Sequence, residues 1–231
     1  MESISKPTPA RQVVTRSPKR GVGILNCPWF QPVAIHHESR LEKHFVLRAM
    51  LSPIVRGILH QPFEITLGPK ERYTPDFLLT FLNGQRAVVE VKRSERIKEL
   101  QDRLDRIADR LADDGIPFFV VHQGQIEGER RAERAALFRR YAMFSVDSQR
   151  LNDAVALVCS RPSGISISSV MKRCRLSQPQ LFHAIARRLV VLGPKLLTSD
   201  SDPVYPPLTE ISDASHQFGS WFGCAAWRTH A

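Results

Sequence analysis

The feature that most constrains the fold of this chain is a pair of short apolar runs joined by a turn dipeptide. Phe77 to Leu82 and Arg86 to Val91 flank Asn83-Gly84, a pair that favours β-hairpins because both residues tolerate positive φ. Apolar residues occupy both faces of these runs, as in strands that are covered on both sides. The sequence therefore predicts two neighbouring antiparallel strands at the centre of a sheet.

The segments around this hairpin predict an α-β-β-β-α-β order and hence an α/β fold. Ser39 and Glu42 fit a capping box at the start of a helix, and Pro53 ends that helix. The other expected elements are a strand at Phe63–Leu67, a helix at Ser94–Ala112, a strand at Pro117–Val121 and a basic helix at Glu129–Tyr141. We expect a mixed sheet flanked by helices on its faces.

The chain changes character near residue 147. The expected elements there are helices at Leu151–Cys159, Ser166–Arg173 and Gln178–Leu192, and wing strands at Leu196–Thr198 and Val204–Tyr205. This spacing is typical of a small helical winged-helix or helix-turn-helix domain. We therefore divide the chain into a flexible basic arm (1–34), an α/β domain (35–146), a winged-helix-like domain (147–205) and a tail (206–231). The tail carries Trp221, Phe222 and Trp227 without a periodic pattern and is a candidate segment for partner docking.

Composition narrows the class of partner. The net charge is +10 over 231 residues, which favours a polyanion because each lysine or arginine that meets a phosphate releases counterions. Nucleic acid is the leading partner. The sequence contains no bilayer-spanning run and no signal-peptide pattern, and its four cysteines form no C-x-x-C pair. We expect reduced thiols in a cytoplasmic protein with no zinc site and no membrane partner.

Three ionisable residues on the hairpin strands form the candidate active site. Glu90 and Lys92 are two residues apart and therefore share one face of a strand. Whether Asp76 joins them depends on the register. A two-residue loop sets Asp76 opposite Val91, whereas a three-residue loop or a bulge sets it opposite Lys92. A functional site thus predicts an odd loop, a bulge, or a strand break just after Pro75.

The residue types suit metal-dependent phosphodiester hydrolysis. Asp76, Glu90 and the Val91 carbonyl would supply oxygen ligands to Mg²⁺ or Mn²⁺, and Lys92 would position water and offset the charge that develops on phosphate. The same spacing also arises by chance, and a charged pair at a strand end is often solvated. Glu90, however, lies in an apolar run, where an unpaired carboxylate costs several kcal/mol.

Other candidates have equally good structural explanations. Glu42 would be a further acid near the metal, although its capping box explains it fully, and Glu38 competes for the same role. His36-His37 lacks a third ligand at a useful spacing. Gln61 either contacts DNA or shapes the turn before the next strand. The remaining candidate DNA contacts are Lys19 and Arg20 in the arm and Gln178, Gln180, His183 and Arg187 on the last helix, which also fit an ordinary solvated surface.

A family resemblance emerges from these motifs. Pro75-Asp76 with Glu90-Val91-Lys92 resembles the PD-(D/E)xK nuclease superfamily, which implies a restriction-endonuclease-like fold. The motifs that resemble a TnsA-type transposon endonuclease, over about residues 15 to 125, are Ser17-Pro18-Lys19-Arg20, Glu38-Ser39-Arg40-Leu41-Glu42, Gln61-Pro62-Phe63, Tyr73-Thr74-Pro75-Asp76-Phe77 and Val89-Glu90-Val91-Lys92. Some members of that family carry glutamine where this chain has Glu90, which is the commoner form in the superfamily.

The resemblance implies a role in cut-and-paste transposition. In that family the nuclease cuts the 5′ ends of a transposon, a TnsB-like DDE transposase cuts and joins the 3′ ends, and a TnsC-like AAA+ ATPase contacts both. It implies Glu42 as an active-site acid, double-stranded DNA at transposon ends as substrate, and a bacterial, nucleoid-associated location. Two alternatives remain open: a stand-alone nuclease of the same superfamily, and a DNA-binding regulator without catalysis.

Overall fold

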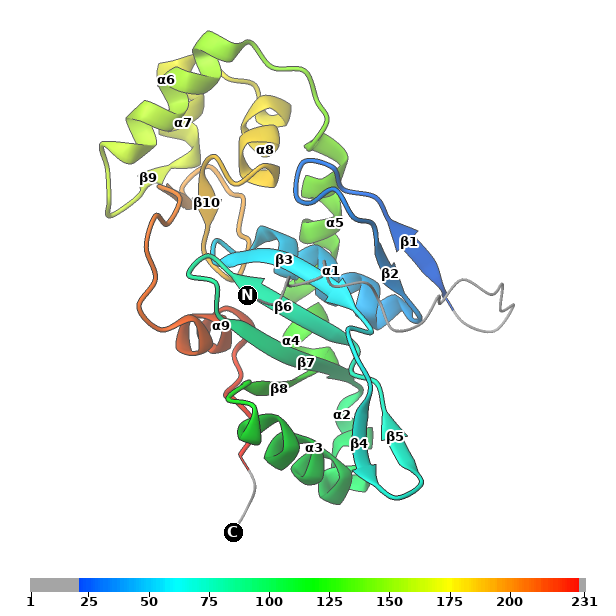
Figure 1. Cartoon of the computed structure of the whole chain (residues 1–231). Helices are drawn as coiled ribbons and strands as arrows, with labels where there is room; N and C mark the ends of the chain where they lie inside the picture. The colour runs from blue at the N-terminus through cyan, green and yellow to red at the C-terminus, as the bar shows by residue number, and fades with distance from the viewer. Residues whose placement is uncertain (1–20, 229–231) are drawn as a thin grey trace.

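A computed structural model describes residues 21–228, and its centre is a four-stranded mixed sheet (Figure 1). The strands are β3 (Val55–His60), β6 (Phe77–Phe81), β7 (Arg86–Lys92) and β8 (Phe118–His122), in the order β3-β6-β7-β8. The first two pairings are antiparallel, and β7 and β8 are parallel. The predicted mixed α/β fold is confirmed, and the hairpin strands β6 and β7 occupy the two central positions.

The connection between β6 and β7 has an odd length, which is one of the three arrangements that a functional site predicts. Gly84 N donates to Phe81 O at 3.0 Å, and Phe81 N donates to Gln85 O at 2.9 Å, which leaves a three-residue loop. Gly84 has φ +82°, a conformation that glycine adopts without steric cost. The register pairs Phe77 with Val89. Asp76, immediately before β6, is therefore in line with Glu90 and not with Lys92, which corrects our expected pairing while keeping all three residues on one face.

Helices cover both faces of the sheet because alternate strand residues point to opposite sides. On one face, Phe77, Leu79 and Phe81 belong to a large apolar cluster. That cluster includes α1 (Arg40–Leu51), α4 (Gln123–Glu127), α5 (Arg131–Tyr141) and α9 (Ala214–Phe222). On the other face, Leu78 and Val88 pack with α3 (Gln101–Asp113). The predicted cap of α1 is present, since Ser39 Oγ accepts a bond from Glu42 N at 3.1 Å.

Several expected elements differ from the structure. The strand expected at Phe63–Leu67 is β4 (Ile65–Gly68), which pairs with β5 (Glu71–Tyr73) in a separate hairpin instead of joining the sheet. The sheet instead uses β3, whose pattern is obscured by Gly57 and by a register shift between Val55 and Gly57. The long helix expected after β7 is divided at Leu100 into α2 (Ser94–Glu99) and α3, and a short 3-10 turn, η1 (Gly128–Arg130), precedes α5.

The segment before α1 packs onto the domain from residue 21 onward. β1 (Gly23–Leu25) pairs with β2 (Ile35–His37), and Leu25 and Cys27 are buried. The Gln31 side chain bonds both the N–H and the carbonyl of Ile58, at 2.9 and 3.0 Å, along the open edge of β3. Lys19 and Arg20 lie outside the described residues.

The second half contains three helices and a small antiparallel sheet. The helices are α6 (Ser148–Cys159), α7 (Ile167–Cys174) and α8 (Gln178–Ala186), and the sheet has the order β10-β11-β9, from Val191–Leu192, Pro203–Tyr205 and Ile165–Ser166. α8 ends earlier than expected because the chain turns through Arg188 at φ +57° and continues into β10. The segment 196–198 forms no strand. The winged-helix assignment of this region stays a prediction.

The aromatic residues of the tail lie in the core. Phe222 packs on Phe45 with ring centroids 5.1 Å apart, and Phe218 packs on Phe119 at 4.8 Å. Trp221 is buried, and Trp227 N donates to Phe118 O of β8 at 2.7 Å. The tail therefore forms a helix that the sequence pattern did not predict. Trp221 and Phe222 are not exposed for docking, so any docking role depends on other residues of the tail.

Two arginine side chains, of which Arg48 is fully buried, connect the halves of the molecule. Arg48, on α1, is 0 % exposed and donates to the carbonyls of Gln125, Pro194 (3.2 Å) and Trp221 (2.9 Å), with its guanidinium over the Phe222 ring. Burial, with a smaller contribution from Arg131, lowers its pKa to about 9. In the opposite direction, Arg188 reaches from the second half to the carbonyls of Ser52 and Val55. Neither arginine forms an ion pair with a carboxylate among residues 21–228.

No helix in the described part of the chain combines the length and apolar character needed to cross a bilayer.

Candidate active site

The hairpin brings Asp76, Glu90 and Lys92 into direct contact. Asp76 N donates to Glu90 Oε2 at 3.3 Å, and Val91 N donates to Asp76 Oδ2 at 2.8 Å. Lys92 Nζ forms an ion pair with Glu90 Oε1 and lies 3.5 Å from Asp76 Oδ2. Two carboxylates thus share one ammonium group at the end of the sheet. The convergence of these three residues follows the sequence prediction, whereas their catalytic roles stay predictions.

The electrostatics of this cluster are unfavourable for a free carboxylate. Glu90 is 3 % exposed, and the Asp76 side chain is 22 % exposed. Burial raises the pKa of Asp76 well above its usual range, and the charge of Glu90 adds to this effect. Burial alone would lower the pKa of Lys92, but the charges of Asp76 and Glu90 outweigh it and raise that pKa. One ammonium for two carboxylates leaves excess negative charge, which a further cation would neutralise.

Glu42 lies beside this cluster but is bonded locally. Its carboxylate accepts bonds from Glu38 N at 2.6 Å and Ser39 Oγ at 2.8 Å. Burial raises its pKa, and its charge acts on Asp76. Its capping role is therefore present in the structure, and its proximity to Asp76 keeps the catalytic role open as a prediction. Glu38, the competing acid, accepts a bond from Gln61 Nε2 at 3.1 Å.

A small hollow adjoins Asp76. Its lining residues are His36, His37, Glu38, Glu42, His60, Gln61 and Asp76. The His36 and His60 rings stack with centroids 4.3 Å apart and planes 3° apart. Burial lowers the pKa of His60 to about 4, with a further contribution from His36, so this ring is neutral at physiological pH. Sequence reasoning missed His60, which lies on the unpredicted strand β3.

Tyr73 is a second residue that sequence reasoning missed as part of the site. Its hydroxyl donates to Glu90 Oε2 from the separate β4–β5 hairpin. Burial raises the pKa of Tyr73 well above its usual range, and the charge of Glu90 adds to this. In the sequence, only its position three residues before Asp76 could have pointed to a place for Tyr73 in the site.

The donor set suits a hard divalent cation in its chemistry. Asp76, Glu90, the Val91 carbonyl and Glu42 offer only oxygen atoms, the donors that Mg²⁺ and Mn²⁺ prefer. Within residues 21–228, however, no group of three histidine, cysteine, aspartate or glutamate side chains stands in metal-ligand geometry. The Glu90 oxygens instead contact Lys92, Tyr73 and Asp76 N. The residues therefore fit the ion by donor type and charge, and the ligand assignment stays a prediction.

The candidate DNA contacts are separated by the fold. Gln61 lies in the hollow next to Asp76, and Gln178 and Arg187 are exposed at the two ends of α8. Gln180 caps that helix, because its Oε1 accepts a bond from Ser177 N at 2.8 Å. His183 is 8 % exposed, with Nδ1 3.1 Å from Tyr141 O. Because α8 turns this side chain towards α5, His183 offers little surface to a ligand, and its expected contact with DNA stays a prediction.

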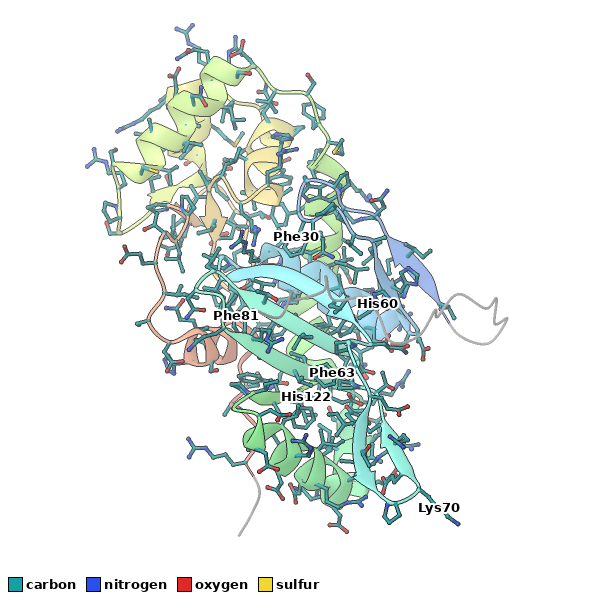
Figure 2. The ribbon with its side chains drawn as sticks, in the orientation of Figure 1. Phe30, His60, Phe63, Lys70, Phe81 and His122 are labelled. Atoms are coloured by element: carbon teal, nitrogen blue, oxygen red, sulfur yellow. The ribbon has the colours of Figure 1, made fainter. Side chains whose placement is uncertain are left out.

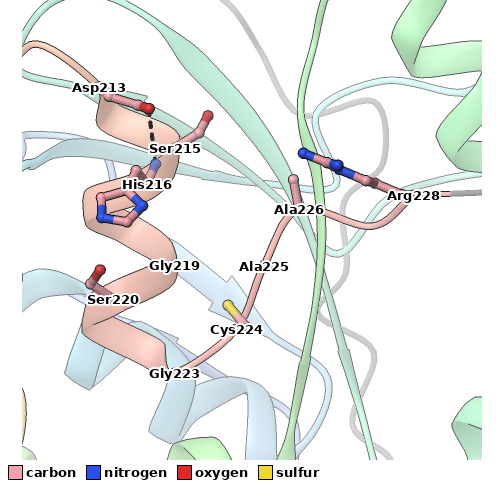
Figure 3. A pocket seen from close by; sticks show the side chains of 10 residues that line it. All are labelled: Asp213, Ser215, His216, Gly219, Ser220, Gly223, Cys224, Ala225, Ala226 and Arg228. Atoms are coloured by element: carbon pink, nitrogen blue, oxygen red, sulfur yellow. Dashed lines mark hydrogen bonds between the residues drawn. The ribbon is translucent and has the colours of Figure 1, made fainter.

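A larger hollow of ≈ 690 Å³ lies elsewhere, between α9 and residues 223–228 (Figure 3). Small side chains such as Ser220, Ala225 and Ala226 line it, together with Asp213 and Arg228. The Asp213 side chain caps the N-terminus of α9 by accepting a hydrogen bond from His216 N at 2.9 Å. This hollow lacks the paired carboxylates and lysine that distinguish the hairpin site, so size does not identify the candidate active site.

Part of the chain that includes the four-stranded sheet matches a known protein family. Residues 52–123 match the family model described as TnsA-like endonuclease N terminal. The matched span runs from just before β3 to just after β8 and contains Asp76, Glu90 and Lys92, whereas Glu42 lies outside it. The search of curated proteins gives no match. The suspected resemblance is confirmed, and the match supports a nuclease related to transposon endonucleases.

Proposed function

We propose that this protein is a metal-dependent DNA endonuclease that hydrolyses phosphodiester bonds at the 5′ ends of a transposon. The proposal rests on the match of residues 52–123 to TnsA-like endonucleases and on the site geometry. The single observation that carries it is Glu90, a carboxylate that is 3 % exposed and contacts both Lys92 and the Asp76 backbone. Two acids and one base meet at this end of the central hairpin, and a bound cation would balance their excess negative charge.

Each residue of the cluster has a distinct role in this proposal. Asp76 and Glu90, with the Val91 carbonyl and Glu42, would hold Mg²⁺ or Mn²⁺, which supplies Lewis-acid activation of phosphate and water when bound. Lys92 places a positive charge between the two carboxylates, where it orients a water molecule and offsets charge on the phosphate oxygens. Val91 N fixes Asp76 Oδ2. The products expected from hydrolysis are a 5′-phosphate and a 3′-hydroxyl.

The proposal includes a multi-protein setting. The family match supports a transposon-related nuclease, and the net charge of +10 favours a DNA substrate. We propose that the chain works with a TnsB-like DDE transposase and a TnsC-like AAA+ ATPase in cut-and-paste transposition. A stand-alone nuclease would cut without these partners, so reactions with and without them separate the two functions.

Replacing Lys92 tests the catalytic assignment directly. We expect Lys92→Ala to reduce strand cleavage by about 10²- to 10³-fold, because it removes one charge that stabilises the transition state. The measurement is single-turnover nicking of transposon-end DNA with Mg²⁺, the transposase and the ATPase present. The matched control is Lys70→Ala, which removes an exposed lysine at the tip of the β4–β5 hairpin (Figure 2). Wild-type cleavage by Lys92→Ala would eliminate the catalytic proposal.

A further inference from the structure

Tyr73 carries an interaction that the catalytic proposal does not use. Its side chain is buried, and its hydroxyl donates to Glu90 Oε2. A buried phenol normally finds a hydrogen-bond partner. Here that partner is the most buried carboxylate of the candidate site. Tyr73 belongs to β5, outside the four-stranded sheet, so a separate element reaches in to contact Glu90.

The contact makes the two oxygens of Glu90 unequal. Oε2 receives the Tyr73 hydroxyl and, at 3.3 Å, the Asp76 N–H. Oε1 contacts only Lys92 among the described residues. A carboxylate oxygen has two lone-pair sites, so Oε2 is fully used by protein donors. Oε1 retains acceptor capacity on the side where Lys92 and Asp76 stand.

The phenol ring is itself held in place by α3. The Arg103 guanidinium lies 5.4 Å from the ring centroid. Arg103 and Arg106 also pair with Glu71, two residues before Tyr73, at 3.4 and 2.9 Å. Tyr73 and Ile65 further pack in the apolar cluster on this face of the sheet. These contacts of the β4–β5 hairpin therefore set where the Tyr73 hydroxyl lies.

We propose that Tyr73 is a positioning residue that fixes one oxygen of Glu90 so that the other faces the cation site. The inference rests on the proposed metal-dependent function. It assigns the β4–β5 hairpin to the metal site, since the hairpin holds the Tyr73 hydroxyl against Glu90. The competing explanation is that Tyr73 only fills the core, in which case the hydroxyl contributes nothing to metal binding.

Tyr73→Phe separates these explanations, because it removes the hydroxyl and keeps the ring. We expect the Kd for Mn²⁺ to rise about 10- to 100-fold, the usual cost of losing a partner that orients a metal ligand. Calorimetry on the full chain without DNA measures this Kd independently of activity. In nicking assays with the partner proteins, the half-saturating Mg²⁺ concentration should rise by a similar factor, with cleavage largely recovered at saturating Mg²⁺. Tyr205→Phe, in the small sheet of the second half, is the matched control.

A second variant tests whether the β4–β5 hairpin influences the metal site through Tyr73. Glu71→Gln weakens the pairing with Arg103 and Arg106 and should weaken Mn²⁺ binding less than Tyr73→Phe does. In the double variant, Glu71→Gln should have no additional effect, because its influence passes through the hydroxyl. An unchanged Mn²⁺ Kd in Tyr73→Phe, with normal binding by wild type, overturns the positioning role alone. If wild type itself binds no Mn²⁺ in either assay, both this inference and the proposed metal dependence are wrong.

Discussion

The hairpin site and helix α8 were both expected to carry functional side chains. In the structure the hairpin residues meet in one cluster, whereas most of α8 is buried in the core. At the hairpin, Asp76, Glu90 and Lys92 meet as expected. On α8, the residues from Leu181 to Ala186 are buried, and only the ends of the helix are exposed. A charged residue within an apolar strand therefore predicts a cluster of interacting side chains better than polar residues along a helix do, because burial of a charge demands a partner.

The largest expected effect tests whether function explains the buried acids at the hairpin. Glu90→Gln should reduce cleavage by about 10²- to 10³-fold while raising the free energy of unfolding by about 1 kcal/mol. The substitution leaves one ammonium for one carboxylate and removes the Glu90 charge, which adds to the effect of burial in raising the pKa of Asp76. Nicking assays and urea unfolding on the same preparation measure both quantities. A large loss of stability would mean that Glu90 is chiefly structural, and the contrast with α8 would then disappear.

A smaller effect concerns buried imidazoles, which occur in both regions as His60 and His183. The pKa of His60 falls to about 4 from 6.5 on folding. The unfolded chain therefore binds the proton first as the pH drops, and stability is lost between about pH 6.5 and pH 4. Between pH 7.5 and pH 5 the loss from His60 is about 2 kcal/mol. Urea unfolding at these two pH values should show a smaller difference for His60→Asn, which keeps an acceptor for His36 N.

His183 provides the comparison for that titration. Burial also lowers the pKa of His183. The part of the stability loss at low pH that comes from His183 should therefore remain in both wild type and His60→Asn. If the free energy of unfolding falls by the same amount between pH 7.5 and pH 5 in wild type and His60→Asn, the His60 ring is protonated in the folded state, contrary to its burial.

The smallest expected effect is on DNA binding by the ends of α8. Arg187→Ala removes one exposed charge and should lower the slope of log K against log salt by about 1 without changing stability. His183→Ala should instead leave the salt slope unchanged and destabilise the fold by about 1–3 kcal/mol, because it opens a cavity and leaves the Tyr141 carbonyl without its contact. Salt-dependent binding to duplex DNA measures the slopes. A reduced slope for His183→Ala would restore this helix as a DNA-reading surface.

The sequence predicted the central hairpin well because its constraints are local. Asn83-Gly84 marked the turn, and the requirement that Asp76 share a face with Glu90 and Lys92 predicted an odd loop, a bulge or a strand break, of which the structure has the odd loop. The expected partner was wrong, because Asp76 is in line with Glu90 and not with Lys92. Strand β3 was missed because Gly57 and the adjacent register shift interrupt its alternation. Tyr73 and His60 were missed as site residues because their roles come from contacts across elements, which no spacing along the chain reveals.

The tail was the other clear failure of prediction, and its cause is also non-local. α9 buries Phe218, Trp221 and Phe222 against the core of the nuclease half, and the segment is too short and too rich in small residues for a helical period to show in the sequence. The family match ends at residue 123, so the resemblance gave no information about it. The exact geometry around Glu42 was likewise beyond the sequence, which allowed the capping role and the catalytic role equally.

Arg48 has a consequence for how this chain can be shortened. Of its three carbonyl partners, only that of Gln125 belongs to the nuclease half, while those of Pro194 and Trp221 come from the end of the chain. A fragment that stops near residue 146 would lose two of the three carbonyls that Arg48 contacts, together with the Phe222 ring that covers its guanidinium, and would expose the apolar core beside it to water. We therefore expect the four-stranded sheet to depend on the C-terminal half for its stability, so that a chain that has lost its last residues unfolds more readily than the full chain.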